Sequence, residues 1–443
     1  MKNRIKFLAV LLLSVMAVTV WGQANKIEFS EFTLDNGLHV ILQPDNTTPN
    51  IIVSIMYHVG SKNEMPDRTG FAHFFEHLMF EGTSNIPRGM FSRYVEEAGG
   101  TLNAGTNFDF TMYYVMLPSN QLELGLWLES ERLLHPKVDS VGIATQKGVV
   151  TEEMKQTRDN QPYGRLLVET VSRAFTTHPY RWDVIGSDPH IRNARDHEFV
   201  DFHDMFYVPN NAVLVIAGDI DISEARPLVE KYFGDIPAGT KEIRRPLPNE
   251  PKRTVEVRDT VYDNIQLPMI IQAYHIPGSG TNDYYATEML GSLLSEGKSS
   301  RLYKSLVDEQ RLALQVAAVP LGYEQPGLTL IIAIPQMGVD PKVLEDAMNK
   351  ELENVRTKLI SEKEMEKLRN QFENQVVNSN TTISSRAMNL AQNYTFFKDA
   401  NRINTTLDKY LSVTREDLQK VANEYFRENN RVVLYFLPKS QMN

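Results

Sequence analysis

Two histidines and a glutamate are spaced so that they can serve one metal ion: His73, Glu76 and His77. On a helix, residues four positions apart lie on one face a turn apart, so both imidazoles can reach a single ion. Glu76 lies beside them, where a carboxylate can take a proton from an attacking water. The neighbouring residues are mostly aromatic or aliphatic, and burying an unpaired carboxylate among them is costly. The spacing therefore predicts a metal site in preference to structural packing.

A catalytic zinc ion usually has three protein ligands and a water, so the third ligand must come from elsewhere in the chain. Glu153 is the candidate, in the helix-like stretch 146–156, and Glu152 is its rival. The chain has no cysteine, so His, Asp and Glu must hold any metal. These ligand types favour Zn²⁺, although manganese or cobalt can occupy the same ligands in vitro.

The elements that carry these residues belong to a chain with an internal repeat, at a spacing of 215 to 219 positions. Single matches of this kind are weak, but a nearly constant spacing makes them informative together. Three pairs of segments match: the strand-like run Val53–His58 with Ile270–His275, Glu81-Gly82 with Glu296-Gly297, and Asn210-Asn211 with Asn429-Asn430. The repeat predicts two related domains of roughly 200 residues each.

The predicted boundary is the stretch 237–252, where Pro, Gly and charged residues replace the apolar periodicity. We expect a first domain over residues 25–236, a linker over 237–252 and a second domain over 253–443. Strand-like runs mix with long amphipathic helices without a regular βαβ rhythm. Capping boxes at Ser361 with Glu364 and at Thr414 with Asp417 predict two helix starts. The pattern predicts an α+β fold, in which largely antiparallel sheets pack against helices.

Residues 1–22 predict a secretory signal peptide, because three cations precede an uncharged run from Phe7 to Val20. The run has 14 residues, fewer than the ~20 that cross a bilayer, so removal is favoured over a stable membrane anchor. We expect an exported protein. A bacterial periplasm is the favoured location, and secretion or a cell-surface location are the alternatives. The formal net charge of −10 argues against nucleic acid as a partner.

The motif His73–His77 resembles that of the pitrilysin/insulinase (M16) family of metallopeptidases, which includes the mitochondrial processing peptidase. The H-x-x-E-H order is the inverted form of the zinc motif. The resemblance extends over essentially the whole mature chain and includes Glu64, the stretch 99–114 and Tyr207-x-Pro209-x-Asn211.

The resemblance implies a zinc endopeptidase that hydrolyses peptides or unfolded polypeptides with a metal-activated water and Glu76 as the proton carrier. It selects Glu153 over Glu152 as the third ligand. It also implies that the substrate adds as a strand at a sheet edge near Asn103 and Ala104, a mode of recognition directed at the backbone. A turn after Gly99-Gly100 is an equal alternative role for Asn103.

The chain departs from the family pattern in ways that concern its partners. Gln146 replaces a Glu seven residues before the third ligand, and the second half has no metal triad. The family's Arg/Tyr pair, which holds substrate near the zinc, is also missing. The residues at the corresponding positions are these: Glu288, Gly291 and Ser292 for the triad, and Val307 and Leu314 for the Arg/Tyr pair.

These departures lead to the hypothesis of a heterodimer in which a related M16-like subunit supplies the Arg/Tyr pair. A homodimer that uses Arg301 and Tyr303 as a different clamp is the alternative. Two other functions stay open at this stage. One is a non-catalytic binding or assembly subunit, which need not keep the residues of the zinc site; the other is zinc-dependent hydrolysis of a non-peptide substrate.

Overall fold

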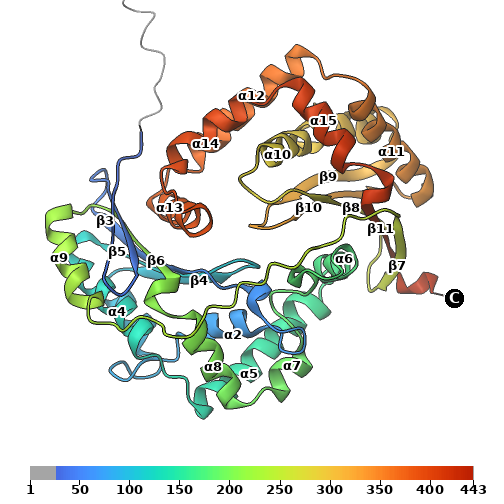
Figure 1. Cartoon of the computed structure of the whole chain (residues 1–443). Helices are drawn as coiled ribbons and strands as arrows, with labels where there is room; N and C mark the ends of the chain where they lie inside the picture. Colours follow the sequence, from blue (N-terminus) through green and yellow to red (C-terminus); the bar gives the residue numbers. More distant parts are fainter. Residues whose placement is uncertain (1–25, 443) are drawn as a thin grey trace, which may run out of the picture.

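The computed structural model describes residues 26–442 and arranges them as two halves, each built on a β-sheet with helices around it (Figure 1). The first sheet contains β1 (Ser30–Thr33), β2 (His39–Pro44), β3 (Asn50–Tyr57), β4 (Thr101–Thr106), β5 (Thr111–Pro118) and β6 (Ala212–Gly218). The second contains β7 (Val257–Asp263), β8 (Met269–Ile276), β9 (Ala313–Leu321), β10 (Gly327–Pro335) and β11 (Arg431–Pro438).

The helices divide between the halves, and short 3-10 or π turns join many of them. In the first half they are α2 (Phe71–Leu78), α3 (Met90–Glu97), α4 (Leu122–Leu134), α5 (Ser140–Met154), α6 (Leu166–Ala174), α7 (Asp188–Asn193), α8 (Asp196–Phe206) and α9 (Ile222–Phe233). In the second half they are α10 (Asn282–Ser295), α11 (Pro341–Thr357), α12 (Glu362–Asn378), α13 (Ile383–Phe397), α14 (Arg402–Leu411) and α15 (Arg415–Tyr425). The two predicted capping boxes do begin α12 and α15.

The two sheets have the same topology. The first has the order β1-β2-β6-β3-β5-β4 and the second β7-β11-β8-β10-β9, so the second repeats the first without β1. In each sheet one pair is parallel, β2 with β6 and β7 with β11, and the other neighbours are antiparallel. The prediction of an α+β fold with two similar, largely antiparallel halves is confirmed.

Equivalent side-chain hydrogen bonds extend the similarity of the two halves to individual residues. The side-chain amide of Asn211 donates to the carbonyls of Phe206 (2.7 Å) and His58 (3.4 Å). In the second half, the amide of Asn430 donates to the carbonyls of Tyr425 (2.7 Å) and His275 (3.0 Å). In each half, therefore, one asparagine links the C-terminal end of a helix, α8 or α15, to the C-terminal end of the equivalent strand, β3 or β8.

The halves also cover each other. Helix α13 of the second half packs on the first sheet, where Leu390 and Ala391 meet Ile52, Met56 and Val215. Reciprocally, α6 of the first half packs on β8 and β11 of the second sheet. Figure 1 shows both helices beside the sheet of the opposite half. The stretch 237–252 contains neither helix nor strand, and the domain limits 25–236 and 253–443 stay a prediction.

The predicted signal peptide, residues 1–22, lies outside the described residues. Within residues 26–442, no helix combines the length and the apolar character that crossing a membrane requires.

Candidate metal centre

Helix α2 presents its chemistry on one face and its core residues on the other. It begins after Gly70, whose φ of 94° lies in the left-handed region that glycine adopts without strain. Phe71, Phe74, Phe75 and Leu78 are buried and pack into the core of the first half. The opposite face is left to the two histidines and Glu76, as the spacing predicted.

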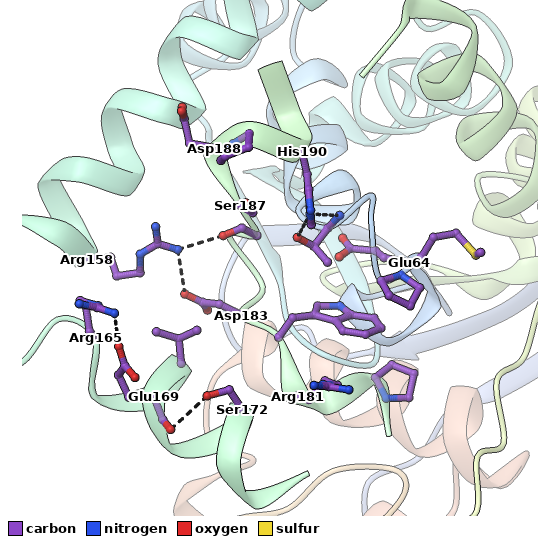
Figure 2. Close-up of a pocket in the computed structure, with 18 of the residues that line it drawn as sticks. Glu64, Arg158, Arg165, Glu169, Ser172, Arg181, Asp183, Ser187, Asp188 and His190 are labelled. Atoms are coloured by element: carbon purple, nitrogen blue, oxygen red, sulfur yellow. Dashed lines mark hydrogen bonds and ion pairs between the residues drawn. The ribbon is translucent and has the colours of Figure 1, made fainter. Parts of the chain in front are cut away.

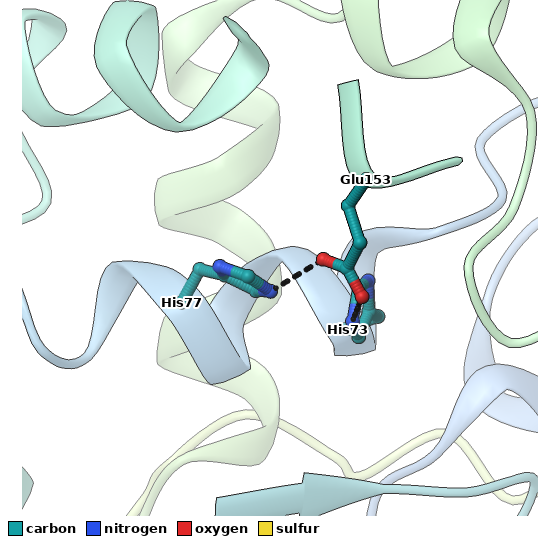
Figure 3. A group of neighbouring side chains, drawn as sticks. All are labelled: His73, His77 and Glu153. Atoms are coloured by element: carbon teal, nitrogen blue, oxygen red, sulfur yellow. Dashed lines mark ion pairs between the residues drawn. The ribbon is translucent and has the colours of Figure 1, made fainter. Parts of the chain in front are cut away.

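The structure brings His73, His77 and Glu153 together, one ligand atom from each lying within 4.8 Å of the others. Glu153 comes from the last turn of α5, and its two carboxylate oxygens lie 3.6 Å from His73 Nε2 and 3.1 Å from His77 Nε2. Figure 3 shows the carboxylate directed at both imidazoles. Glu152, the rival ligand, is exposed and pairs with Lys155 instead.

This cluster fits a zinc ion. Ligands at about 2.0–2.1 Å from a tetrahedral zinc lie roughly 3.3 Å from one another. Each imidazole Nε2 faces its own oxygen of Glu153 at a comparable separation, 3.6 Å for His73 and 3.1 Å for His77. Burial, reinforced by neighbouring His77, lowers the pKa of His73 to about 4, so its imidazole is neutral as a ligand must be. The hydrogen bond with His77 lowers the pKa of Glu153, which keeps that carboxylate charged.

Glu76 lies on the same helix face and does not belong to the cluster. Burial raises the pKa of its carboxyl, which suits a group that takes up a proton near neutral pH. Helix α2 packs against β4, and β4 is an edge strand of its sheet. Asn103 is exposed on this strand and accepts a hydrogen bond from the backbone N–H of Ala104 at 2.9 Å.

Gln146 lies two helical turns before Glu153 on α5, and its hydrogen-bond partner is outside the cluster of His73, His77 and Glu153. Its amide Nε2 donates to Glu81 at 2.6 Å, and Glu81 also pairs with Arg88 at 3.2 Å. The glutamine is therefore part of a hydrogen-bonded group that links α5 to the segment just after α2.

Glu64 caps α2, the helix that carries both histidines, a role that the sequence reasoning missed. Its carboxylate accepts the backbone N–H groups of Gly70 and Ala72, both at 2.9 Å. Burial raises the pKa of this carboxyl to about 8, against the opposing effect of those N–H groups. Because Gly70 has no side chain, Glu64 supplies the cap that the helix lacks locally.

A cavity of about 1330 Å³ lies apart from the metal centre, since none of the three clustered residues lines it. Glu64 and His190 line one side of it, and Arg158 is directed toward Asp183 on the other (Figure 2). The cavity thus lies beside the N-terminal end of α2.

Among the described residues of the second half, up to 442, no equivalent site is found. Glu288 is buried in α10, where Tyr284 donates to it at 2.8 Å and Tyr410 donates to its other oxygen. Gly291 faces the ring of Pro320, and Ser292 bonds to Glu296. Arg301, one of the two residues of the proposed alternative clamp, is already engaged, since it forms a two-point ion pair with Glu364 at 2.9 and 3.1 Å.

Fold and site together define a two-domain protein of metallopeptidase-like architecture. Two family profiles match the chain: one described as insulinase (peptidase family M16) over residues 39–185, and one described as the peptidase M16 inactive domain over residues 197–372. The zinc protease PqqE of Helicobacter pylori is 31% identical over 98% of this chain and 99% of its own length. This chain belongs to the insulinase family, peptidase family M16.

Other relatives and solved structures agree. An uncharacterized zinc protease of Bacillus subtilis, YmxG, is 22% identical over 91% of this chain and 97% of its own. The crystal structure of a protease from Helicobacter pylori matches with a TM-score of 0.88 and 29% identity, over 93% of this chain and all of that one. Pitrilysin shares the fold, with a TM-score of 0.77 and 17% identity. The match covers 94% of this chain and 45% of the pitrilysin chain.

Proposed function

We propose that this chain is a zinc endopeptidase acting on peptides or unfolded polypeptides. The observation that carries the proposal is the convergence of His73, His77 and Glu153 beside Glu76, on a helix packed against an edge strand. Zinc held by these three side chains would lower the pKa of a water and polarise the substrate carbonyl.

The chain's own residues supply the rest of the reaction. The Glu76 carboxylate takes a proton from the attacking water and returns it to the nitrogen of the leaving amine. The edge strand β4, at Asn103 and Ala104, pairs with the backbone of an extended peptide and holds its carbonyl near the metal. No covalent intermediate forms, because the nucleophile is water.

Metal content and hydrolysis of a quenched fluorescent peptide library test this proposal, with the wild-type chain beside Glu76→Gln. We expect one zinc per chain in both, and a loss of cleavage of at least ~10²-fold in the variant, the scale of a lost general base. Bound zinc without cleavage by the lone wild-type chain would keep the metal assignment and point to a missing partner subunit. If cleavage were still absent with such a partner, the second candidate, a non-catalytic binding or assembly subunit, would be favoured. A chain without zinc would contradict the zinc endopeptidase.

We also propose that the active assembly is a heterodimer with a related M16-like subunit. Support comes from Val307 and Leu314 at the Arg/Tyr positions, and from Arg301, which its ion pair with Glu364 already occupies. A solved fold of this kind, pitrilysin, is about twice as long as the stretch this chain covers. Light scattering and a peptidase assay on the lone chain test the idea, and full activity as a homodimer would contradict it.

Export completes the proposal. Its support is the charge and hydropathy pattern of residues 1–22. Fractionation of cells, with mass spectrometry of the mature N-terminus, tests it, and an intact leader in the cytoplasm would rule it out.

A further inference from the structure

A turn of the second half completes a buried charge cluster in the first. Lys62 is 1% exposed and Asp109 3% exposed, and Lys62 Nζ donates to Asp109 Oδ1 at 2.7 Å. The second carboxylate partner of Lys62 is Glu324, which lies in the turn between β9 and β10. Glu324 also bonds to His58 Nε2 at 2.8 Å, and its backbone N–H donates to Asp109 at 3.0 Å. Removing Glu324 would leave the buried ammonium with one carboxylate.

The turn is held firmly in place. The ring of Tyr323 lies 4.8 Å from that of Phe108 and 4.6 Å from that of Tyr180. The backbone N–H of Gln325 donates to the hydroxyl of Tyr180 at 3.2 Å, and its side chain donates to the carbonyl of Pro246 at 3.1 Å. Glu324 therefore meets Lys62 from a rigid position.

Lys62 lies two residues from the cap of the metal-bearing helix. It belongs to the single 3-10 turn Ser61–Asn63, and Glu64, the next residue, caps α2 through Gly70 and Ala72, directly before His73. Gly60, directly before the turn, packs closely against the segment 107–109, since a Cβ on Gly60 would come within 2.4 Å of the Asn107 carbonyl oxygen. A displacement of Lys62 is therefore passed on to Glu64 and to the start of α2.

Asp109 connects the same cluster to the edge strand. It lies in the turn 107–110 between β4 and β5, which is closed by the hydrogen bond from Asn107 N–H to the Phe110 carbonyl at 2.9 Å. Both elements that the proposed reaction needs, the metal-bearing helix and the edge strand, thus meet at one buried ion cluster.

We propose that Glu324, a residue of the half without a metal site, is a positioning residue for the metal centre: through Lys62 and Glu64 it sets the start of α2, and through Asp109 the end of β4. The inference rests on the proposed function, because it assumes that His73, His77 and Glu153 hold a metal. It assigns the second half a part in the site beyond covering the first sheet.

The test compares Glu324→Gln with Glu345→Gln in the full chain. Glu345 is a suitable control because its carboxylate is ion-paired too, but only within the second half, where it pairs with Arg258 and accepts a hydrogen bond from Tyr435. The measurements are the zinc dissociation constant and the visible absorption spectrum of the Co²⁺-substituted protein. We expect Glu324→Gln to weaken zinc binding about 10-fold, as loss of a supporting residue does, and to alter the cobalt spectrum. Glu345→Gln should lower the melting temperature and leave both metal readouts unchanged.

A cobalt spectrum and a zinc affinity equal to wild type in Glu324→Gln would overturn the inference while leaving the proposed function intact. A wild-type chain that binds no metal would overturn both. Glu324→Asp serves as the conservative variant if Glu324→Gln does not fold: it keeps the charge, and its metal readouts should lie closer to wild type than those of Glu324→Ala. Equal readouts for Asp and Ala would also overturn the inference.

Discussion

Helices α2 and α10 occupy equivalent places in two sheets of the same topology, yet they differ in what they can do. In α2, the histidines are partly open, with side-chain exposures of 12% and 25%, and a carboxylate from α5 faces them. In α10, Glu288 is enclosed by two tyrosine hydroxyls, and Gly291 leaves no space between the helix and Pro320. The two helices therefore share a framework, and of the two only α2 presents a group of partly exposed side chains that could hold an ion.

The comparison shows that chemistry depends here on a few side chains, while the fold is held by others. The asparagines Asn211 and Asn430 make the same pair of hydrogen bonds in both halves. Those contacts stabilise the architecture in each half, whether or not a metal site is present.

The largest effect should come from breaking the site at its third ligand. Glu153→Gln removes the negative charge of the one carboxylate in the cluster, and we expect zinc affinity to fall by more than ~100-fold, beyond the loss for a supporting residue. Equilibrium dialysis against a zinc buffer measures it. Glu152→Gln is the matched control on the neighbouring residue, and an equal loss in that variant would mean that the wrong glutamate has been assigned.

A smaller effect should follow from placing a glutamate in α10 at the position equivalent to Glu76. Gly291 takes the place of Glu76, but a Cβ there would lie 3.3 Å from Pro320. Gly291→Glu should therefore lower the free energy of unfolding by about 2 kcal/mol through overpacking. Urea denaturation measures this change.

Gly148→Glu is the control for that substitution. Gly148 is exposed on α5, and a Cβ there meets nothing within 4 Å, so better helix propensity should stabilise the variant by ~0.5–1 kcal/mol. If both variants were equally stable, α10 would be less tightly enclosed than the structure indicates.

The smallest effect concerns Glu288, which in the second half occupies the position equivalent to His73. Burial raises the pKa of Glu288 above its ordinary value of 4.5. The unfolded chain then loses this proton at a lower pH than the folded one, so ionisation destabilises the fold progressively as pH rises above 4.5. Glu288→Gln cannot ionise, and its melting temperature relative to wild type should increase between pH 4.5 and 8. A difference that does not change with pH would show that Glu288 titrates normally.

Local patterns in the sequence predicted much of this molecule. Val53–His58 was expected as a strand and lies within β3 apart from its last residue, and Ser361 and Thr414 cap the helices expected from them. The spacing of His73, Glu76 and His77 predicted a shared helix face, because helical periodicity is a local property. Spacing alone did not separate Glu153 from Glu152, since that choice depends on how α5 is turned toward α2.

Long-range contacts were beyond such patterns. An amphipathic pattern shows that α13 buries one face, but it does not show that the buried face meets the sheet of the other half. Lys62 gave no signal of burial, because a lysine is usually exposed and its two carboxylate partners lie 47 and 262 positions away.

The cover that α13 gives the first sheet has a consequence for synthesis. Strand β6, which completes that sheet, ends at Gly218, whereas α13 begins at Ile383. At ~5–20 residues per second, the apolar face formed by Ile52, Met56 and Val215 would stay uncovered for about 10–30 s on the ribosome. The nascent chain thus has no cover for this apolar face until α13 has been made, and delayed folding of the first sheet would avoid its exposure during that interval.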